Sequence, residues 1–251
     1  MKTLAIDVGG SGLKAALLDD KGTMIGERVR VATPYPCPPQ TLIAALRELT
    51  SQMPPFDRIS AGFPGMVRAD AVIEVPALSR ASLGGARDLA LVRAWSGFKI
   101  ANALEEEFGR PVRVANDADV QGCAVARGEG LEFVMTLGTG CGTAIFWQGD
   151  LLPHLELSHG PFRDGETYDD QIGDVTRQRI GNRRWRVRVL RAIDAFDAML
   201  WFDHLYLGGG NARHLHEKDL GPKATIIPNV AGLLGGIKLW DQPWDTRGRR
   251  P

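Results

Sequence analysis

The chain has 251 residues, 44% of them hydrophobic, and its 30 Lys and Arg residues balance 30 Asp and Glu residues. This composition suffices for one large domain or two lobes, and a balanced charge favours neither nucleic acid nor acidic membranes as partners. We find no leader segment, membrane-length apolar run or paired-cysteine motif, so we expect a cytoplasmic globular protein without nucleic-acid or membrane partners.

The first apolar run ends in an acid and is followed by a tight glycine turn. Strands are predicted over Leu4–Val8, Leu13–Leu18 and Met24–Thr33, with the turn at Gly9–Gly12. The turn lacks the third glycine of a dinucleotide fingerprint and the Gly-Lys-Ser/Thr ending of a Walker A loop. It is therefore either a surface hairpin whose glycines supply positive φ angles or a phosphate-binding turn of another kind.

Helical and extended segments alternate after this opening unit. Apolar residues spaced for one helix face predict helices over 41–53 and 97–109. Between them, 58–67 is predicted as a strand that breaks at Pro64-Gly65. These segments are typical of an α/β protein.

A polar corner follows the next predicted strand, Val112–Ala115. Asn116 and Asp117 stand there, directly before a predicted helix. A carboxylate is favoured at a helix N-terminus, so the position of Asp117 is typical of a helix cap.

The order of strand, glycine turn and strand recurs half a chain later. Strands are predicted over Phe133–Leu137, Thr143–Trp147 and Leu151–Leu157, with a glycine turn at Gly138–Gly142. A duplicated fold with two facing lobes would set both turns at one cleft, where exposed backbone N–H groups bind anions. The repeat therefore favours phosphate binding over two unrelated hairpins.

Helices and short strands also make up the end of the chain. The predicted elements are a helix over Asn182–Asp203, a strand over His204–Leu207, a turn at Gly208–Asn211, a strand over Thr225–Ile227, a helix over Val230–Leu239 and a tail over 243–251.

Five segments, in order along the chain, resemble motifs of the ROK family of sugar kinases. DVGGSGLK (7–14) is similar to the family's first phosphate motif, in the form typical of its polyphosphate glucokinase branch. The others resemble the catalytic segment, the second phosphate motif, the nucleotide-side turn and the closing helix: ANDADVQG (115–122), TLGTGCGTA (136–144), YLGGGNA (206–212) and PNVAGLLGGI (228–237).

The resemblance implies a duplicated actin/hexokinase/Hsp70-like (ribonuclease H-like) α/β fold with a cleft between two lobes. The expected lobes are 1–115 with about 237–251, and 116–236. A homodimer is also expected.

The resemblance implies a role for each motif as well. Asp117 would take the proton from the sugar 6-hydroxyl as the phosphoryl group arrives. Phosphate binding would fall to Asp7, Gly9, Gly10, Ser11, Gly12, Lys14, Gly138, Thr139, Gly140 and Gly142, and nucleotide binding to Gly208, Gly209 and Gly210. Sugar binding would fall to Pro64, Gly65, Asn116, Asp117, Glu156, His159 and Glu166.

The implied reaction is phosphorylation of glucose at its 6-hydroxyl, with polyphosphate and/or ATP as donor and Mg²⁺ held by Asp7 through water. Alternatives are a kinase for another hexose, such as fructose, mannose or an N-acetylhexosamine, and a non-catalytic sugar-sensing protein of the same fold.

The sequence departs from the family pattern beside the expected sugar site. Most members carry a cysteine-rich zinc site after the histidine, whereas 159–170 contains no cysteine, so no zinc is expected. Ser158 stands where the family has glycine, and Glu166 is followed by acids where the family has small residues. Cys141, inside a glycine turn, is either an inert filler or a thiol of low pKa.

Arginine is concentrated in one segment, although the whole chain has a balanced charge. Seven arginines fall within TRQRIGNRRWRVRVLR (176–191). They form either a solvated helix face or a basic track for a polyphosphate chain. His214 and His216 are expected in an exposed loop rather than at a metal.

Overall fold

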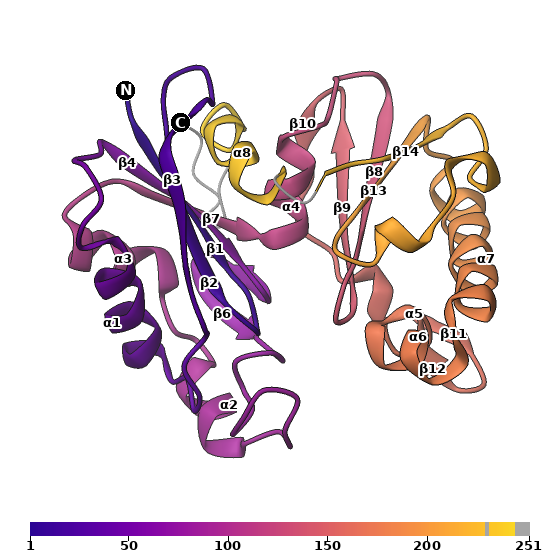
Figure 1. The fold of residues 1–251 in the computed structure, drawn as a ribbon, viewed down its shortest axis with the longest axis horizontal. Coiled ribbons are helices and arrows are strands. Elements are labelled where there is room, and N and C mark those ends of the chain that lie inside the picture. The colour runs from indigo at the N-terminus through magenta and orange to yellow at the C-terminus, as the bar shows by residue number, and fades with distance from the viewer. Residues whose placement is uncertain (229–230, 244–251) are drawn as a thin grey trace. The chain divides into compact units, whose positions relative to one another are not determined.

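The computed structural model describes residues 1–228 and 231–243, which fall into two compact units (Figure 1). One unit holds Met1–Ala124 and the described part of Gly232–Pro251, and the other holds Val125–Ala231. The first boundary lies after helix α4 (Asp117–Cys123), whereas the expected division placed it at 115/116. Helix α4 packs on the sheet of the first unit, which explains the difference.

A five-stranded mixed sheet forms the centre of the first unit, in the order β3-β2-β1-β4-β7. The first two pairs are antiparallel, and β1, β4 and β7 run parallel. The strands are β1 (Thr3–Val8), β2 (Leu13–Leu18), β3 (Met24–Val31), β4 (Arg58–Phe63) and β7 (Val112–Asn116).

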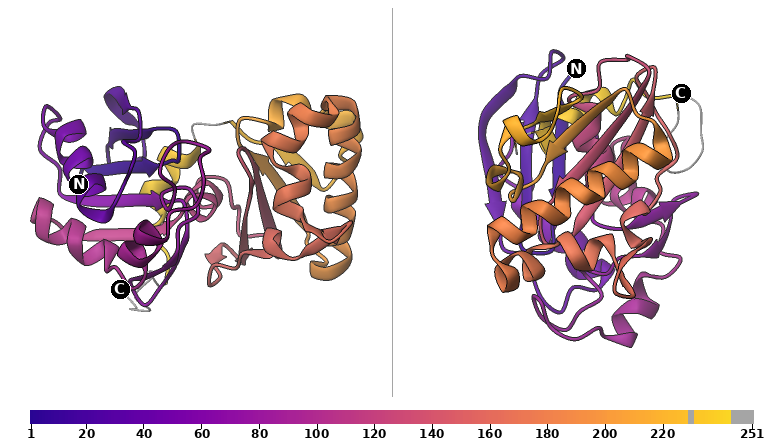
Figure 2. Two further views of the ribbon diagram at one scale, coloured as in Figure 1. Left: turned by 90° about the horizontal axis from the view of Figure 1, so that it is seen from below. Right: turned by 90° about the vertical axis from the view of Figure 1, so that its right-hand side faces the viewer.

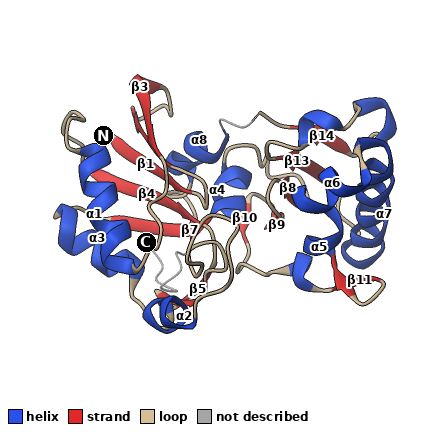
Figure 3. Ribbon diagram, turned by 60° about the horizontal axis from the view of Figure 1, so that its bottom comes forward, coloured by secondary structure: helices blue, strands red, loops and turns tan. Residues whose placement is uncertain are grey.

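Helices cover both faces of this sheet (Figure 3). Alternate residues of β1 face opposite sides, so Leu4 and Ile6 pack in the core with α1 and α3, while Ala5 packs with α8. The remaining elements of the unit are α1 (Pro39–Thr50), β5 (Met66–Arg68), β6 (Ala71–Glu74), α2 (Leu89–Trp95), α3 (Ile100–Phe108) and α8 (Ala231–Lys238).

The sheet of the second unit repeats this arrangement, in the order β10-β9-β8-β13-β14. An antiparallel β8–β9 hairpin again stands beside strands that run parallel to its first strand. The strands are β8 (Leu131–Leu137), β9 (Cys141–Trp147), β10 (Asp150–Leu151), β13 (His204–Gly208) and β14 (Ala224–Ile226). The repeat predicted from the two glycine turns is therefore present as two similar sheets.

Helix α7 (Asn182–Leu200) lies along one face of this second sheet, in orange in Figure 2. Its side chains Trp185, Val189 and Phe196 are fully buried in a core with residues of β8 and β13. The unit also contains η1 (Leu157–His159), β11 (Pro161–Arg163), β12 (Glu166–Thr167), α5 (Tyr168–Ile172), α6 (Asp174–Ile180), η2 (Ala212–His214) and η3 (Glu217–Asp219).

Several sequence predictions were wrong in extent, among them the helix expected over 41–53, which ends at Thr50. The strand expected over 151–157 is only the two-residue β10, because the chain leaves the sheet at Pro153, which has no N–H to donate. The helix expected to reach Asp203 ends at Leu200, where Trp201 takes a left-handed conformation with φ of 52°. The predicted start of the last helix at Val230, and the tail after Pro243, lie outside the described residues.

None of the described helices combines the length and the hydropathy that a bilayer crossing needs.

Candidate functional site

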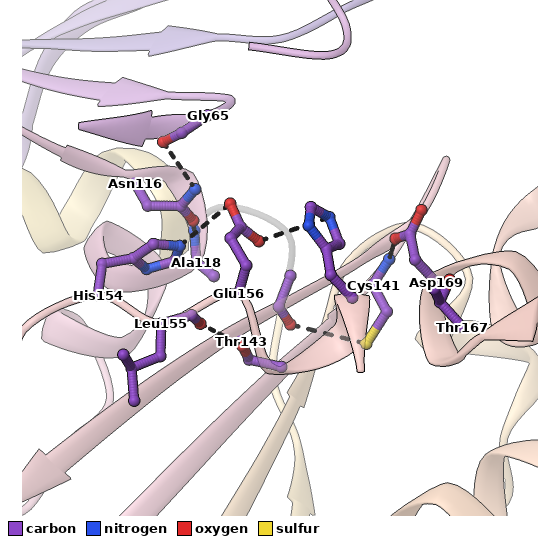
Figure 4. Close-up of polar contacts among 12 residues, drawn as sticks. Gly65, Asn116, Ala118, Cys141, Thr143, His154, Leu155, Glu156, Thr167 and Asp169 are labelled. Carbon is purple, nitrogen blue, oxygen red and sulfur yellow. Dashed lines mark hydrogen bonds and ion pairs between the residues drawn. The ribbon is translucent and has the colours of Figure 1, made fainter. Parts of the chain in front are cut away.

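The Asn116-Asp117 corner lies where β7 ends and α4 begins. The Asn116 side chain is the N-cap of α4, with its oxygen accepting from the Ala118 N–H at 2.8 Å (Figure 4). Its Nδ2 donates to the Gly65 carbonyl at 3.4 Å. Asn116 is therefore the N-cap, and half-buried Asp117 occupies the first position of the helix, where its own Oδ1 also accepts from the Ala118 N–H at 2.9 Å.

The Pro64-Gly65 corner is fixed beside Asn116 by the register of the sheet. Phe63, the last residue of β4, lies opposite Asn116 on the parallel strand β7. A side chain at Gly65 would overlap with the Glu74 carbonyl and lie 3.0 Å from Val75 Cα, so only glycine fits this corner. The structure thus brings together the sugar-side residues expected in this unit.

Asp7 and Lys14 form an ion pair across the β1–β2 hairpin. They are direct cross-strand partners, and Lys14 Nζ lies 2.6 Å from Asp7 Oδ2. Asp7 is also in register with Gly62 of β4, which is in register with Ala115 of β7. Asp7 and Asp117 therefore lie at the carboxyl ends of parallel strands with only β4 between those strands, the edge where α/β sheets bind ligands.

Two side-chain hydroxyl groups donate hydrogen bonds to carbonyl groups of the first glycine turn. Thr33 Oγ1 donates to the Gly9 carbonyl at 2.6 Å, and the Tyr35 hydroxyl donates to the Gly10 carbonyl at 2.7 Å. The Gly9 N–H donates to the Gly12 carbonyl at 3.1 Å, so Gly9 shapes the turn through its own amide.

Asp169 and Asp174, which the sequence did not indicate as site residues, hydrogen-bond to the second glycine turn. Asp169 Oδ1 accepts from the Cys141 N–H at 2.6 Å, and a side chain at Gly140 would overlap with that carboxylate. The Asp174 N–H donates to the Gly138 and Thr139 carbonyls, both at 3.1 Å. These bonds fix the conformation of the turn between β8 and β9.

The third turn, Gly208–Gly210, lies against the second one. Asn211 Nδ2 donates to the Gly138 carbonyl and to Asp174 Oδ1, both at 3.0 Å. Gly209 has a φ of 83°, and a side chain there would overlap with the Leu137 backbone. Two predicted phosphate and nucleotide turns thus meet at the carboxyl ends of the neighbouring parallel strands β8 and β13.

Glu156 lies between two histidines on the segment that follows β10. Its carboxylate is 3.4 Å from His154 Nε2 (Figure 4). It is also 3.8 Å from His159 Nε2. Burial would raise the pKa of Glu156, but the hydrogen bond and charge of His154 and the charge of His159 outweigh it, so the pKa is lowered. Glu156 and His159 are brought together as expected, and His154 is a partner that the motif did not indicate.

A further acid, Asp169, interacts electrostatically with His159 and Glu156. Glu166 is exposed on β12, and its carboxylate contacts Gln171 Nε2. Burial raises the pKa of Asp169, and the charges of His159 and Glu156 act on it as well. Burial also raises the pKa of the Cys141 thiol, so the alternative of a reactive thiolate in the turn is wrong.

Asp169 and Asp170 are adjacent carboxylates for which we predict opposite effects on stability. Burial raises the pKa of Asp169, so its ionisation opposes folding above the pH at which the unfolded chain loses that proton. Hydrogen bonds from Thr167 lower the pKa of Asp170, so its ionised form stabilises the fold until the pH falls through that lowered value.

Thermal unfolding at pH 8 and at about pH 3 tests this pair, since unfolded aspartate titrates near ~3.9. Asp169→Asn should raise Tm at pH 8 and lose that advantage in acid, whereas Asp170→Asn should lower Tm at pH 8. Shifts of the same sign for both variants would contradict the assigned environments.

Among residues 1–228 and 231–243, no three His, Cys, Asp or Glu side chains gather into a metal-binding group. Mg²⁺ needs fewer protein ligands, because it commonly takes one or two carboxylates together with substrate phosphates and water. Asp7 at the strand edge fits that requirement.

We predict that the purified chain contains no stoichiometric zinc, because 159–170 lacks the cysteines of the usual site. Metal analysis should find none, and prolonged chelation should leave Tm unchanged. Tightly held zinc, or unfolding on chelation, would show that other residues supply the ligands.

Comparison with known proteins decides the family. The family model described as ROK family matches residues 3–154. The chain belongs to the ROK family. Its similarity to the polyphosphate glucokinase of Mycobacterium tuberculosis (strain ATCC 25618 / H37Rv) is 28% identity, covering 92% of this chain and 88% of that protein.

Solved structures of sugar kinases share the fold. An inorganic polyphosphate/ATP-glucomannokinase from Arthrobacter sp. strain KM matches with a TM-score of 0.79 and 28% identity, covering 94% of this chain and 96% of that one. A ROK family glucokinase from Streptomyces griseus matches with a TM-score of 0.72 and 16% identity, covering 95% and 99%. The expected α/β fold of the actin/hexokinase type is thereby confirmed.

Proposed function

We propose that this ROK protein is a sugar kinase that transfers a phosphoryl group from polyphosphate or ATP to the 6-hydroxyl of glucose. The observation that carries the proposal is the pair of acids, Asp7 and Asp117, at the carboxyl ends of parallel strands separated only by β4. Similarity to named polyphosphate glucokinases along 92% of the chain supports the same reaction.

Asp117 is the proposed general base. A base must lie within hydrogen-bond reach of the hydroxyl that it deprotonates, and a rigid helix start provides such a position. Asn116 fixes this start through its bonds to Ala118 and Gly65, so the sheet sets the place of the Asp117 carboxylate. Lys14, whose Nζ lies 2.6 Å from Asp7 Oδ2, would offer its remaining N–H groups to the incoming phosphates.

The sugar hydroxyls are assigned to Glu156, His159 and Asp169. Carboxylates accept hydrogen bonds from neighbouring hydroxyls, and the lowered pKa of Glu156 keeps it ionised for that purpose. Asp169 replaces Glu166 in this proposal, because Asp169 lies at the glycine turn whereas Glu166 is exposed.

The glycine turns of both units are assigned to donor phosphates. Phosphoryl transfer needs positioning and charge neutralisation more than covalent help from the protein. Mg²⁺, held by Asp7 through water, would supply charge neutralisation on the transferring group. Within the second unit, Asp174 and Asn211 would hold the two turns in place for that purpose.

A coupled phosphorylation assay over a panel of hexoses, with ATP and with polyphosphate, tests the proposal. We expect the highest kcat/KM with glucose and turnover with both donors. A preference for mannose or an N-acetylhexosamine would show that glucose is not the main substrate. Turnover with ATP alone would show that polyphosphate is not a donor. Sugar binding without any turnover would favour the sugar-sensing alternative.

A further inference from the structure

The arginines of 176–191 do not form one continuous track, because the structure divides them between two sides of α7. Trp185 and Val189 point into the core and separate the two sides. On one side Arg186 contacts His216, and on the other Arg188 contacts Gln171. Helical spacing places Arg183 on the side of Arg186.

The first side gathers basic residues from three segments of the second unit. Arg177 Nη1 donates to Asn182 Oδ1 at 2.9 Å, and Asn182 Nδ2 lies 3.4 Å from His214 Nδ1. Arg213 Nε lies 3.4 Å from His214 Nε2. We call this group the basic cluster: Arg177, Arg183, Arg186, Arg213, His214 and His216.

Like charges crowd one another in the basic cluster. Burial lowers the pKa of His214, and the charges of Arg177, Arg213 and Arg186 lower it further against the opposing charge of Asp174. Arg183 and Arg213 are exposed. Cations that repel one another at an exposed surface gain energy when an anion binds among them.

The basic cluster begins beside the phosphate turns. Asp174 Oδ1 accepts from Arg177 Nε at 2.8 Å and from Asn211 Nδ2 at 3.0 Å. The same Asn211 Nδ2 donates to the Gly138 carbonyl. One acid thus joins the first arginine of the cluster to the turns that we assign to the donor.

On the opposite side of α7, acidic residues accompany the arginines. Arg188 contacts Gln171, and the acids Asp164 and Glu166 act on its charge together with Arg163 and Arg179. Helical spacing places Arg184 and Arg191 on this side as well. Both are exposed and both lie on the same helix as Arg183 and Arg186, so they form a natural control.

We propose that the basic cluster binds the part of a polyphosphate chain that extends beyond the phosphates held at the glycine turns. The proposal rests on the proposed function, in which polyphosphate is a donor. Planar guanidinium groups bind phosphate oxygens through paired hydrogen bonds, so successive phosphates of one chain can engage successive arginines. ATP and tripolyphosphate carry only three phosphates, so in this proposal they bind at the turns and do not extend to the cluster.

Two double variants that remove the same charge test the proposal. Arg183→Gln with Arg186→Gln should raise KM for long-chain polyphosphate about tenfold, the effect of two contacts worth roughly 0.7 kcal/mol each. Its KM for ATP and for tripolyphosphate, and its kcat, should stay within about twofold of wild type. Arg184→Gln with Arg191→Gln should leave all these values within about twofold.

Salt gives an independent readout. KM of the wild type for long-chain polyphosphate should rise with salt more steeply than that of the Arg183/Arg186 variant, because fewer ionic contacts remain in the variant. Equal increases in both double variants would indicate a general charge effect and overturn the proposal. An equal increase with ATP would assign the cluster to the nucleotide instead.

Calorimetric binding of long-chain polyphosphate separates failure of this proposal from failure of the proposed function. Weaker binding by the Arg183/Arg186 variant alone supports the cluster even where turnover occurs only with ATP. Binding that is absent in the wild type, or equal in all three proteins, overturns it. Matching Tm values for the three proteins exclude misfolding as the cause.

Discussion

Replacing Asp117 with asparagine is expected to lower kcat by about 10²-fold or more, the usual scale for loss of a general base. The substitution keeps the size of the side chain and removes its capacity to accept a proton. Asn116, which caps α4, is untouched, and the amide oxygen of the new asparagine can still accept from the Ala118 N–H, so the start of the helix and the affinity for sugar should be nearly unchanged. Steady-state kinetics and thermal unfolding of the same preparation measure both quantities.

Asn116→Ala is the companion variant, because it removes the cap and leaves the Asp117 carboxylate. Loss of an N-cap costs about 1 kcal/mol, so Tm of this variant should fall by several degrees. Near wild-type turnover in Asp117→Asn together with a lowered Tm would assign the capping role to Asp117 after all.

Gly235→Ala is expected to cause the largest loss of stability, and with it a loss of activity. Gly235 lies in α8 where that helix crosses α4, and an added Cβ would overlap with the Val120 carbonyl oxygen and lie 2.9 Å from its carbon. Alanine improves helix propensity by about 1 kcal/mol, but overlap with backbone that cannot yield costs more, about 1–3 kcal/mol or above. We expect Tm to fall by about 5–10 °C.

Activity should fall in the same variant because α4 carries Asp117 at its first residue. Gly236→Ala is the matched control in the same helix. Its Cβ would meet Ser60 Cβ at 3.1 Å and Ala5 Cβ at 3.2 Å, which are tight contacts without the overlap that Gly235 would make with backbone. A wild-type Tm for Gly235→Ala, or a larger loss for Gly236→Ala, would contradict the packing of α8 against α4.

Much of the fold was predictable because local sequence patterns agree with the final environment. The hairpin β1–β2 has the predicted strand limits to within one residue, and Gly109 ends α3 with a φ of 60° as expected. Helices α5 and α6 were not predicted, since each has at most seven residues and too few turns to show an apolar period. Their places depend on packing with β9 and α7.

The site residues that belong to one short motif were predictable from the sequence. Those that reach the site only when distant segments fold together were not. The Asn116-Asp117 corner and the three glycine turns could be identified from the sequence. Asp169 could not, because only the folding of α5 against β9 brings it to the Cys141 N–H. Asn211 was visible next to the third turn, but its bonds to Gly138 and Asp174 join segments far apart in the chain.

Analysis of the product by ³¹P nuclear magnetic resonance tests the central claim most directly. Wild type and Asp117→Asn would be incubated with glucose and Mg²⁺, in parallel with ATP and with polyphosphate. The account predicts that glucose 6-phosphate accumulates with the wild type and is nearly absent with the variant. Absence of any phosphorylated sugar from the wild type with either donor, or equal amounts from both proteins, would contradict it.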